Sequence, residues 1–113
     1  MKFLDLAKTR YSVRRYKNQK VEQEKLDLIL EAGRVAPTAC NYQPQRLIVV
    51  QDEEHLRKLT RYNAPLAFIV CVDITEVWER PYDKKKSTDV DASIITDHMM
   101  LQYRIRLGKH LAT

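Results

Sequence analysis

A single domain that mixes α-helices with buried β-strands is predicted for this chain of 113 residues. The length suffices for one hydrophobic core and not for two. Hydrophobic residues make up 44% of the sequence and charged residues 31%, as in soluble globular domains. Stretches with apolar residues at helical spacing alternate with short, continuous apolar runs of strand length, and this alternation predicts the mixture of helices and strands.

The first part of the chain contains two predicted helices joined by an extended arm. A short helix begins at Phe3, because Phe3, Leu6 and Ala7 have helical spacing. Residues 11–20 show no helical period and are expected to be extended. A longer helix is predicted over 21–36, and Pro37 ends it. Its apolar stripe consists of Leu26, Ile29, Leu30 and Gly33.

Two predicted strands follow, with a short helix between them. Residues 46–51 contain a continuous apolar run of strand length, which is typical of a strand buried on both faces. Asp52 can cap a helix over 53–60. Residues 66–72 form a second run of the same kind. Two strands alone make a marginal sheet, so either a partner chain or further sequence is expected to complete it.

The last predicted element is a helix that follows an irregular segment over 73–87. Thr88 or Asp89 is expected to cap this helix. Its helical spacing is carried by Ile94, Ile95, His98, Leu101 and Gln102.

Composition excludes several classes of protein. Only 2 glycines are present, far below a usual share of about 7%, so a P-loop and a GxGxxG dinucleotide loop are both ruled out. No apolar run reaches the roughly 18 residues of a membrane-spanning helix, and the N-terminus is no signal peptide. The cysteines, Cys40 and Cys71, are too few for a disulfide scaffold, so a reduced, cytoplasmic protein is expected.

The net charge of +5 is concentrated in the first 20 residues, which carry +6, whereas the rest of the chain carries −1. A focus of this kind suits a compact anion better than a long nucleic-acid backbone. In an extended arm, Arg10, Ser12 and Arg14 point the same way, with the two arginines about 13 Å apart. They can bind a long ligand that has a phosphate at one end, while a solvated basic arm is an equally good interpretation.

A second candidate site is the uncharged loop at 36–44, which follows the longer helix. Its amides and hydroxyls suit hydrogen bonding to a neutral polar ring or a polyol chain, although a plain helix-to-strand connection is the commoner use of such a pattern. Cys40 within it is more readily a small buried residue than a nucleophile. Lys84, Lys85 and Lys86 are expected in a solvated loop, and Met99 with Met100 in the core.

At this point the residues resemble the flavin-dependent nitroreductase family. The resemblance is carried by TRYSVRRYKNQKV at 9–21, LDLILEAGRVAPTACNYQPQRLIVV at 26–50 and NAPLAFIVCVD at 63–73. It extends from residue 3 to about 102. It implies an α+β homodimer with helices around a mixed, antiparallel-rich sheet, which overrules the parallel arrangement suggested by the strand–helix–strand order.

The resemblance also implies a cofactor and its binding residues. Arg10 and Ser12 would bind the 5′-phosphate of FMN, and Arg14 would reach the pyrimidine edge of the flavin. The 37–41 loop would line the flavin of the other subunit. No catalytic side chain and no metal ligand are expected. The implied FMN-binding set is Arg10, Tyr11, Ser12, Arg14, Pro37, Thr38, Ala39, Asn41 and Gln43.

The implied activity is an NAD(P)H oxidoreductase that reduces nitroaromatic, quinone or similar electron-poor substrates by a ping-pong mechanism. Neither nucleic acid nor a membrane is an expected partner. The alternative, from another class, is a small basic module whose 1–20 arm binds nucleic acid. These two functions differ in bound flavin and in the salt dependence of binding.

The resemblance ends near Gln102, so residues 1–102 are interpreted as the N-terminal part of a nitroreductase-like domain and 103–113 as a tail foreign to the family. Family members continue with a Gly-rich segment that is lacking here, so the fold is expected to be incomplete at the C-terminus. One back-translation of residues 103–111, read in a neighbouring frame, gives a Gly-Leu-Gly segment similar to that of the family. We therefore expect a frameshift, with Gly108 ending the last helix and residues 109–113 frayed.

Overall fold

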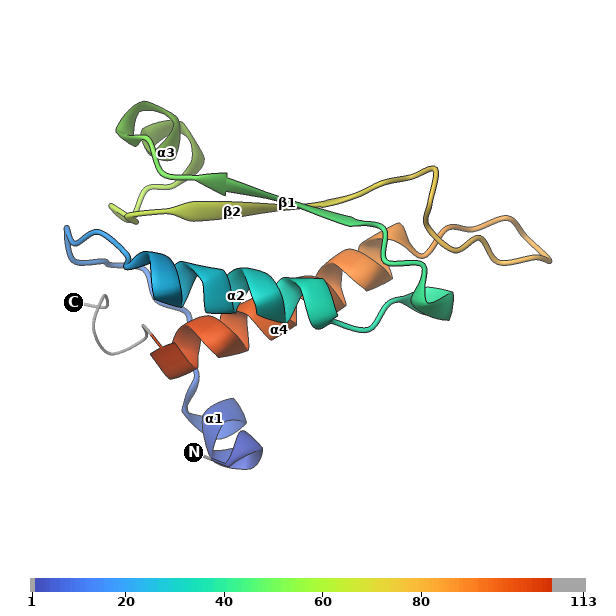
Figure 1. Cartoon of the computed structure of the whole chain (residues 1–113), viewed down its shortest axis with the longest axis horizontal. Coiled ribbons are helices and arrows are strands. Elements are labelled where there is room, and N and C mark those ends of the chain that lie inside the picture. The colour runs from blue at the N-terminus through green and yellow to red at the C-terminus, as the bar shows by residue number, and fades with distance from the viewer. Residues whose placement is uncertain (1, 107–113) are drawn as a thin grey trace.

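The computed structural model describes residues 2–106 and shows the two longest helices packed against one face of a small antiparallel sheet (Figure 1). The α+β architecture expected from the resemblance is confirmed. Within these residues, no helix combines the length and the apolar character that a membrane crossing requires. The elements are α1 (Phe3–Thr9), α2 (Gln23–Val35), the 3-10 turn η1 (Ala39–Asn41), β1 (Gln45–Val50), α3 (Glu53–Leu59), β2 (Ala67–Val72) and α4 (Thr88–Arg106).

Strands β1 and β2 pair antiparallel, from Gln45 opposite Val72 to Val50 opposite Ala67. Successive side chains of a strand point to opposite faces, so the sheet has an inner and an outer face. The inner face packs against helices α2 and α4. Its side chains are Leu47, Val49, Phe68 and Val70.

The hydrophobic core lies between α2, α4 and the inner face of the sheet. Gly33 of α2 is buried there, where the helix approaches its neighbours closely. A Cβ added at Gly33 would lie 2.8 Å from Sδ of Met99 and 2.9 Å from Cδ1 of Leu47. The fully packed members of this core are Val21, Leu26, Ile29, Ala36, Ile95 and Met99.

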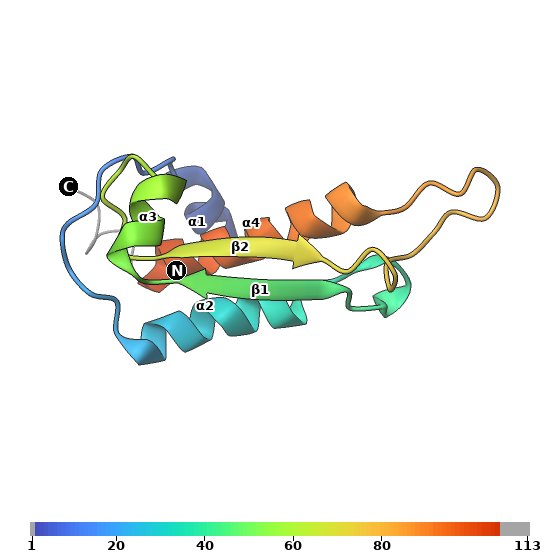
Figure 2. The same ribbon diagram turned by 90° about the horizontal axis from the view of Figure 1, so that it is seen from above.

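The prediction that both strands are buried on both faces is wrong for the described residues. Ile48 is 49% exposed and its cross-strand partner Ile69 is 37% exposed. The physical reason is that α2 and α4 lie on the same side of the sheet (Figure 1), so in the view from above the strands lie in front of both helices (Figure 2). The apolar pair on the outer face is therefore left uncovered by the described part of the chain.

The predicted helix boundaries hold to within about two residues. Helix α2 begins at Gln23 rather than at 21, and it ends at Val35, before Pro37 as expected. The Asp52 cap is confirmed, because its carboxylate accepts the backbone N–H of His55 at 3.1 Å. The 73–87 segment is largely irregular as predicted, with one isolated bridge between Glu79 and Lys86.

The start of α4 differs slightly from the prediction. Thr88 is its first helical residue, so neither Thr88 nor Asp89 lies at the cap position. Ser87 takes that place, and its carbonyl accepts the N–H of Asp91 at 2.9 Å. The helix continues past Gln102 to Arg106. The predictions for Gly108 and for residues 109–113 lie outside the described residues.

Candidate functional site

The basic arm begins where α1 ends. Arg10 caps the helix in an extended conformation, with φ −65° and ψ 147°. Residues 11–20 form no helix, as predicted, and carry only an isolated bridge at Tyr16 and a bend at Asn18. Arg10, Ser12 and Arg14 are all exposed, and within residues 2–106 neither arginine forms an ion pair. The arm therefore presents hydrogen-bond donors and positive charge that an anion can use.

The arm is held against the C-terminal part of α4 by an aromatic contact. The guanidinium carbon of Arg104 lies 5.1 Å from the ring centroid of Tyr11, within cation–π range. Tyr11 lies between Arg10 and Ser12 in the sequence. Its contact with Arg104 places this part of the arm next to the C-terminal part of α4.

The polar loop after α2 has an unusual backbone. Cys40, Asn41 and Gln43 have φ values of 52°, 55° and 52°, although none of them is glycine. This left-handed conformation costs about 1–2 kcal/mol for an ordinary L-residue. Such strain persists where surrounding contacts fix the backbone, and it is found at binding sites more often than elsewhere.

Side chains within the loop supply part of this support. The hydroxyl oxygen of Thr38 accepts the backbone N–H of Gln43 at 3.0 Å and its side-chain amide at 3.2 Å. The same Gln43 amide donates to Oδ1 of Asn41 at 2.6 Å, and Gln45 donates to Oε1 of Gln43 at 2.7 Å. Asn41 is exposed, and its oxygen is occupied by Gln43, whereas its amide N–H groups form no hydrogen bond within residues 2–106.

The loop is also fastened to the N-terminal turn of α4. Oδ1 of Asp91 accepts the backbone N–H of Ala39 at 3.1 Å. Asp91 is only 1% exposed and was missed by the sequence analysis. The sequence does contain a signal for a buried acid at this position. Asp91 precedes Ile95 and Met99 at intervals of four residues, so it lies on the apolar stripe of the predicted helix.

The structure does not bring the arm and the loop together within one chain. Asp91 holds the loop near one end of α4, and Arg104 contacts the arm near the other. The 13 residues that separate these two positions correspond to about 20 Å along a helix. The arm and the loop of one chain are thus anchored near opposite ends of α4.

Other sequence-based expectations have mixed outcomes. The prediction that Cys40 is buried is wrong: its thiol is exposed, because the left-handed turn directs residue 40 away from the core. Lys84, Lys85 and Lys86 are exposed as predicted. Met99 lies in the core as expected, but Met100 is 36% exposed.

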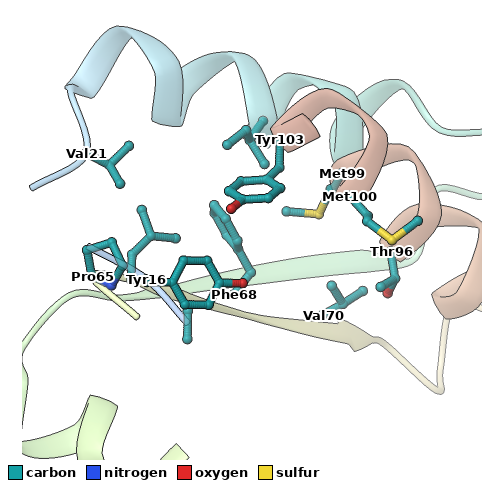
Figure 3. Close-up of a pocket in the computed structure, with 12 residues that line it drawn as sticks. Tyr16, Val21, Pro65, Phe68, Val70, Thr96, Met99, Met100 and Tyr103 are labelled. Atoms are coloured by element: carbon teal, nitrogen blue, oxygen red, sulfur yellow. The ribbon is translucent and has the colours of Figure 1, made fainter. Parts of the chain in front are cut away.

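A cavity of about 270 Å³ lies between β2, α4 and the segment around Tyr16 (Figure 3). None of the side chains that line it is charged, so it is not a site for a phosphate. The Tyr103 hydroxyl is buried, and among the described residues it has no hydrogen-bond partner. Burial, together with the neighbouring Tyr16, raises the pKa of Tyr103 above its ordinary value. The residues that line the cavity are Tyr16, Val21, Ile29, Pro65, Leu66, Ala67, Phe68, Val70, Thr96, Met99, Met100 and Tyr103.

Comparison with known proteins identifies the family. The profile of the nitroreductase family matches residues 7–68, which is more than half of the chain and includes both the arm and the loop. The chain belongs to the nitroreductase family. The alternative interpretation, a nucleic-acid-binding module, gains no support from this match.

Solved and curated relatives agree with this assignment. A nitroreductase family protein from Clostridium difficile 630 superposes with a TM-score of 0.86 at 55% identity, over 91% of this chain and 62% of its own. An FMN-dependent nitroreductase from Clostridium difficile R20291 gives 0.75 at 33% identity, over 91% and 61%. The FMN reductase [NAD(P)H] of Bacillus subtilis is 36% identical over 70 residues, which are 55% of this chain and 28% of that protein. The chain thus spans less than two thirds of the length of these relatives.

Proposed function

We propose that this chain forms the FMN-binding part of a flavin-dependent NAD(P)H oxidoreductase. The observation that carries the proposal is the pair of exposed polar segments, the arm at 10–14 and the loop at 37–43, on a nitroreductase fold. The names of two relatives, an FMN-dependent nitroreductase and an FMN reductase that uses NAD(P)H, support the choice of cofactor.

The donor set of the arm fits the anionic end of FMN. Arg10 offers a guanidinium and Ser12 a hydroxyl, and both are exposed. Guanidinium groups match phosphate oxygens in a forked geometry, so this pair suits the 5′-phosphate. Arg14 lies two residues after Ser12 in the arm and would contact the pyrimidine edge of the flavin.

The loop supplies the complementary, neutral part of the site. Pro37 and Asn41 are both exposed, and the amide N–H groups of Asn41 are unused within the described residues. Because the loop and the arm of one chain lie about 20 Å apart along α4, we propose that the loop of one copy covers the flavin held by the arm of another. A homodimer with two equivalent sites follows from this arrangement.

Bound FMN would supply the hydride acceptor and electron carrier that no side chain provides. The positive charge of Arg14 would stabilise negative charge on the reduced ring. Side chains of this chain would then orient NAD(P)H and, after it leaves, an electron-poor acceptor such as a nitroaromatic or a quinone. This order of events predicts ping-pong kinetics.

Titration with FMN and with riboflavin, which lacks the phosphate, tests the proposal. Arg10→Ala removes a charge-assisted bond of about 1.5–3 kcal/mol, so FMN affinity should fall about 10- to 140-fold while riboflavin affinity is unchanged. Arg14→Ala should weaken both ligands. Arg15→Ala, an equal loss of charge in the same exposed arm, is the matched control and should have little effect on either.

Two results would contradict the proposal. An equal loss of FMN and riboflavin affinity in Arg10→Ala would show that Arg10 does not bind the phosphate. A wild-type chain that binds no FMN, and instead binds RNA or DNA with strong salt dependence, would favour the nucleic-acid alternative.

A further inference from the structure

The buried carboxyl group of Asp91 has no part in the site as described so far. Asp91 belongs to the first turn of α4 and is among the most completely buried large side chains of the described residues, together with Ile29 and Ile95. Burying a carboxyl group is unfavourable unless its oxygens are hydrogen-bonded. Its position on the apolar stripe of α4 therefore calls for an explanation beyond packing.

Both carboxyl oxygens of Asp91 are satisfied, and their partners differ in kind. Oδ2 accepts the hydroxyl of Ser87 at 3.0 Å, which is a local bond at the start of the same helix. Oδ1 accepts the backbone N–H of Ala39 at 3.1 Å, and Ala39 lies 52 residues earlier in the sequence. The second bond ties the polar loop directly to the N-terminal turn of α4, where the helix dipole also favours a carboxylate.

Ala39 is the residue through which α4 can control the loop. It is the first residue of η1 and immediately precedes Cys40 and Asn41, whose φ values are positive. The bonds among Thr38, Asn41 and Gln43 stay within the loop, and the Gln45 amide links Gln43 to carbonyls at the end of α2, but none of these bonds reaches α4. The hydrogen bond to Asp91 connects this strained turn to α4, and α4 in turn packs against α2 and the sheet.

We propose that Asp91 is a positioning residue for the loop at 37–43. It fixes Ala39 in space and thereby sets the direction in which Asn41 presents its amide. That this direction is toward a flavin rests on the proposed function, whereas the fixing of the loop does not. Asp91 itself touches no ligand, because its side chain is buried and both oxygens are occupied within the chain.

Amide hydrogen exchange of the flavin-free full chain, read residue by residue by NMR, tests the fixing of the loop. In the wild-type chain the Ala39 amide should exchange as slowly as amides of the helices, although it lies in a loop. Asp91→Ala should raise the exchange rates of the Ala39, Asn41 and Gln43 amides by about tenfold or more. The amides of Ile29 and Ile95 in the core should keep their rates.

Two matched variants separate positioning from general stability. Asp91→Asn retains Oδ1 as an acceptor and should restore slow exchange in the loop. Ser87→Ala removes the local bond to Oδ2 but leaves the Ala39 bond, so the loop amides should stay protected. A uniform rise of exchange in loop and core alike in Asp91→Ala would overturn the proposal.

The wild-type measurement keeps the proposal open to refutation even if Asp91→Ala does not fold. An Ala39 amide that exchanges as fast as a solvent-exposed loop amide in the wild-type chain would overturn it. FMN titration of the same variants then tests the link to the cofactor. FMN affinity that falls in Asp91→Ala and returns in Asp91→Asn would extend the role of Asp91 to the cofactor. Loss of loop protection with unchanged FMN affinity would leave Asp91 as a positioning residue and refute the contact between loop and flavin.

Discussion

The close approach of α2 to its neighbours at Gly33 makes the Gly33→Ala variant a quantitative test of the core. In a helix, alanine is favoured over glycine by about 1 kcal/mol, so the substitution would stabilise an isolated helix. In this structure the new Cβ would lie 2.8 Å from Sδ of Met99 and 2.9 Å from Cδ1 of Leu47. Ordinary van der Waals contact requires about 3.5–4.0 Å between such atoms, so both side chains must move.

The gain in helix propensity and the cost of overpacking the core oppose each other, and the cost of overpacking is expected to be larger. Overpacking a close-packed core typically costs about 1–3 kcal/mol. Met99 borders the cavity of about 270 Å³, so its Sδ can shift toward that space, but its Cγ also lies 3.0 Å from the new Cβ and Leu47 must move as well. The net result should be a loss of about 1 kcal/mol of unfolding free energy, or about 4 °C in Tm for a domain of this size.

Urea denaturation of the single and double variants measures this balance. Met99→Ala alone should cost about 2–5 kcal/mol because it leaves a cavity. Adding Gly33→Ala in that background should stabilise the chain, because the new methyl group fills the vacated space and the helix propensity gain remains. A Gly33→Ala chain that is as stable as the wild type or more stable would refute the argument from close approach.

Further predictions concern the α3 cap, the open sheet face and the buried tyrosine. The hydrogen bond with His55 holds the pKa of Asp52 below its usual value. The cap therefore contributes stability at neutral pH, and this contribution is lost as the pH falls through the lowered pKa. Unfolding measured as a function of pH should show a smaller decrease in unfolding free energy at acidic pH for Asp52→Asn than for the wild type. Ile48→Lys and Ile69→Lys should each reduce aggregation measured by light scattering, because they place a charge on the uncovered apolar pair; unchanged scattering would show that this face does not associate. Tyr103→Phe removes a buried hydroxyl that lacks a partner among the described residues and should raise the unfolding free energy by up to about 1 kcal/mol; a lower free energy would show that the hydroxyl is bonded.

Local sequence signals were sufficient for most of the elements. Asp52 as a cap predicted the start of α3, and Pro37 predicted the end of α2, because caps and prolines act on the few residues next to them. The apolar runs predicted both strands. Their antiparallel pairing came from the family resemblance, because residue order alone suggested a parallel arrangement.

Features that depend on distant residues could not be predicted in the same way. The exposure of Ile48 and Ile69 depends on which face the helices cover, and that is decided by tertiary packing. The exposed thiol of Cys40 lies in a left-handed turn, and no glycine in the loop indicates such a turn in the sequence. Asp91 shows the opposite case, since an acid on an apolar stripe was visible in the sequence, although its partner Ala39 was not.

The central claim is that one flavin site combines the arm of one copy with the loop of another, and mixed dimers test it most directly. Arg10→Ala and Asn41→Ala chains, co-expressed with different affinity tags and purified through both, would form dimers that carry one defect in each copy. If the site is shared between copies, one of the two sites keeps an intact arm and an intact loop, so the mixed dimer should bind about half as much FMN as the wild type at wild-type affinity. A mixed dimer that shows no wild-type-affinity binding would place arm and loop of the same chain at one flavin and contradict the account.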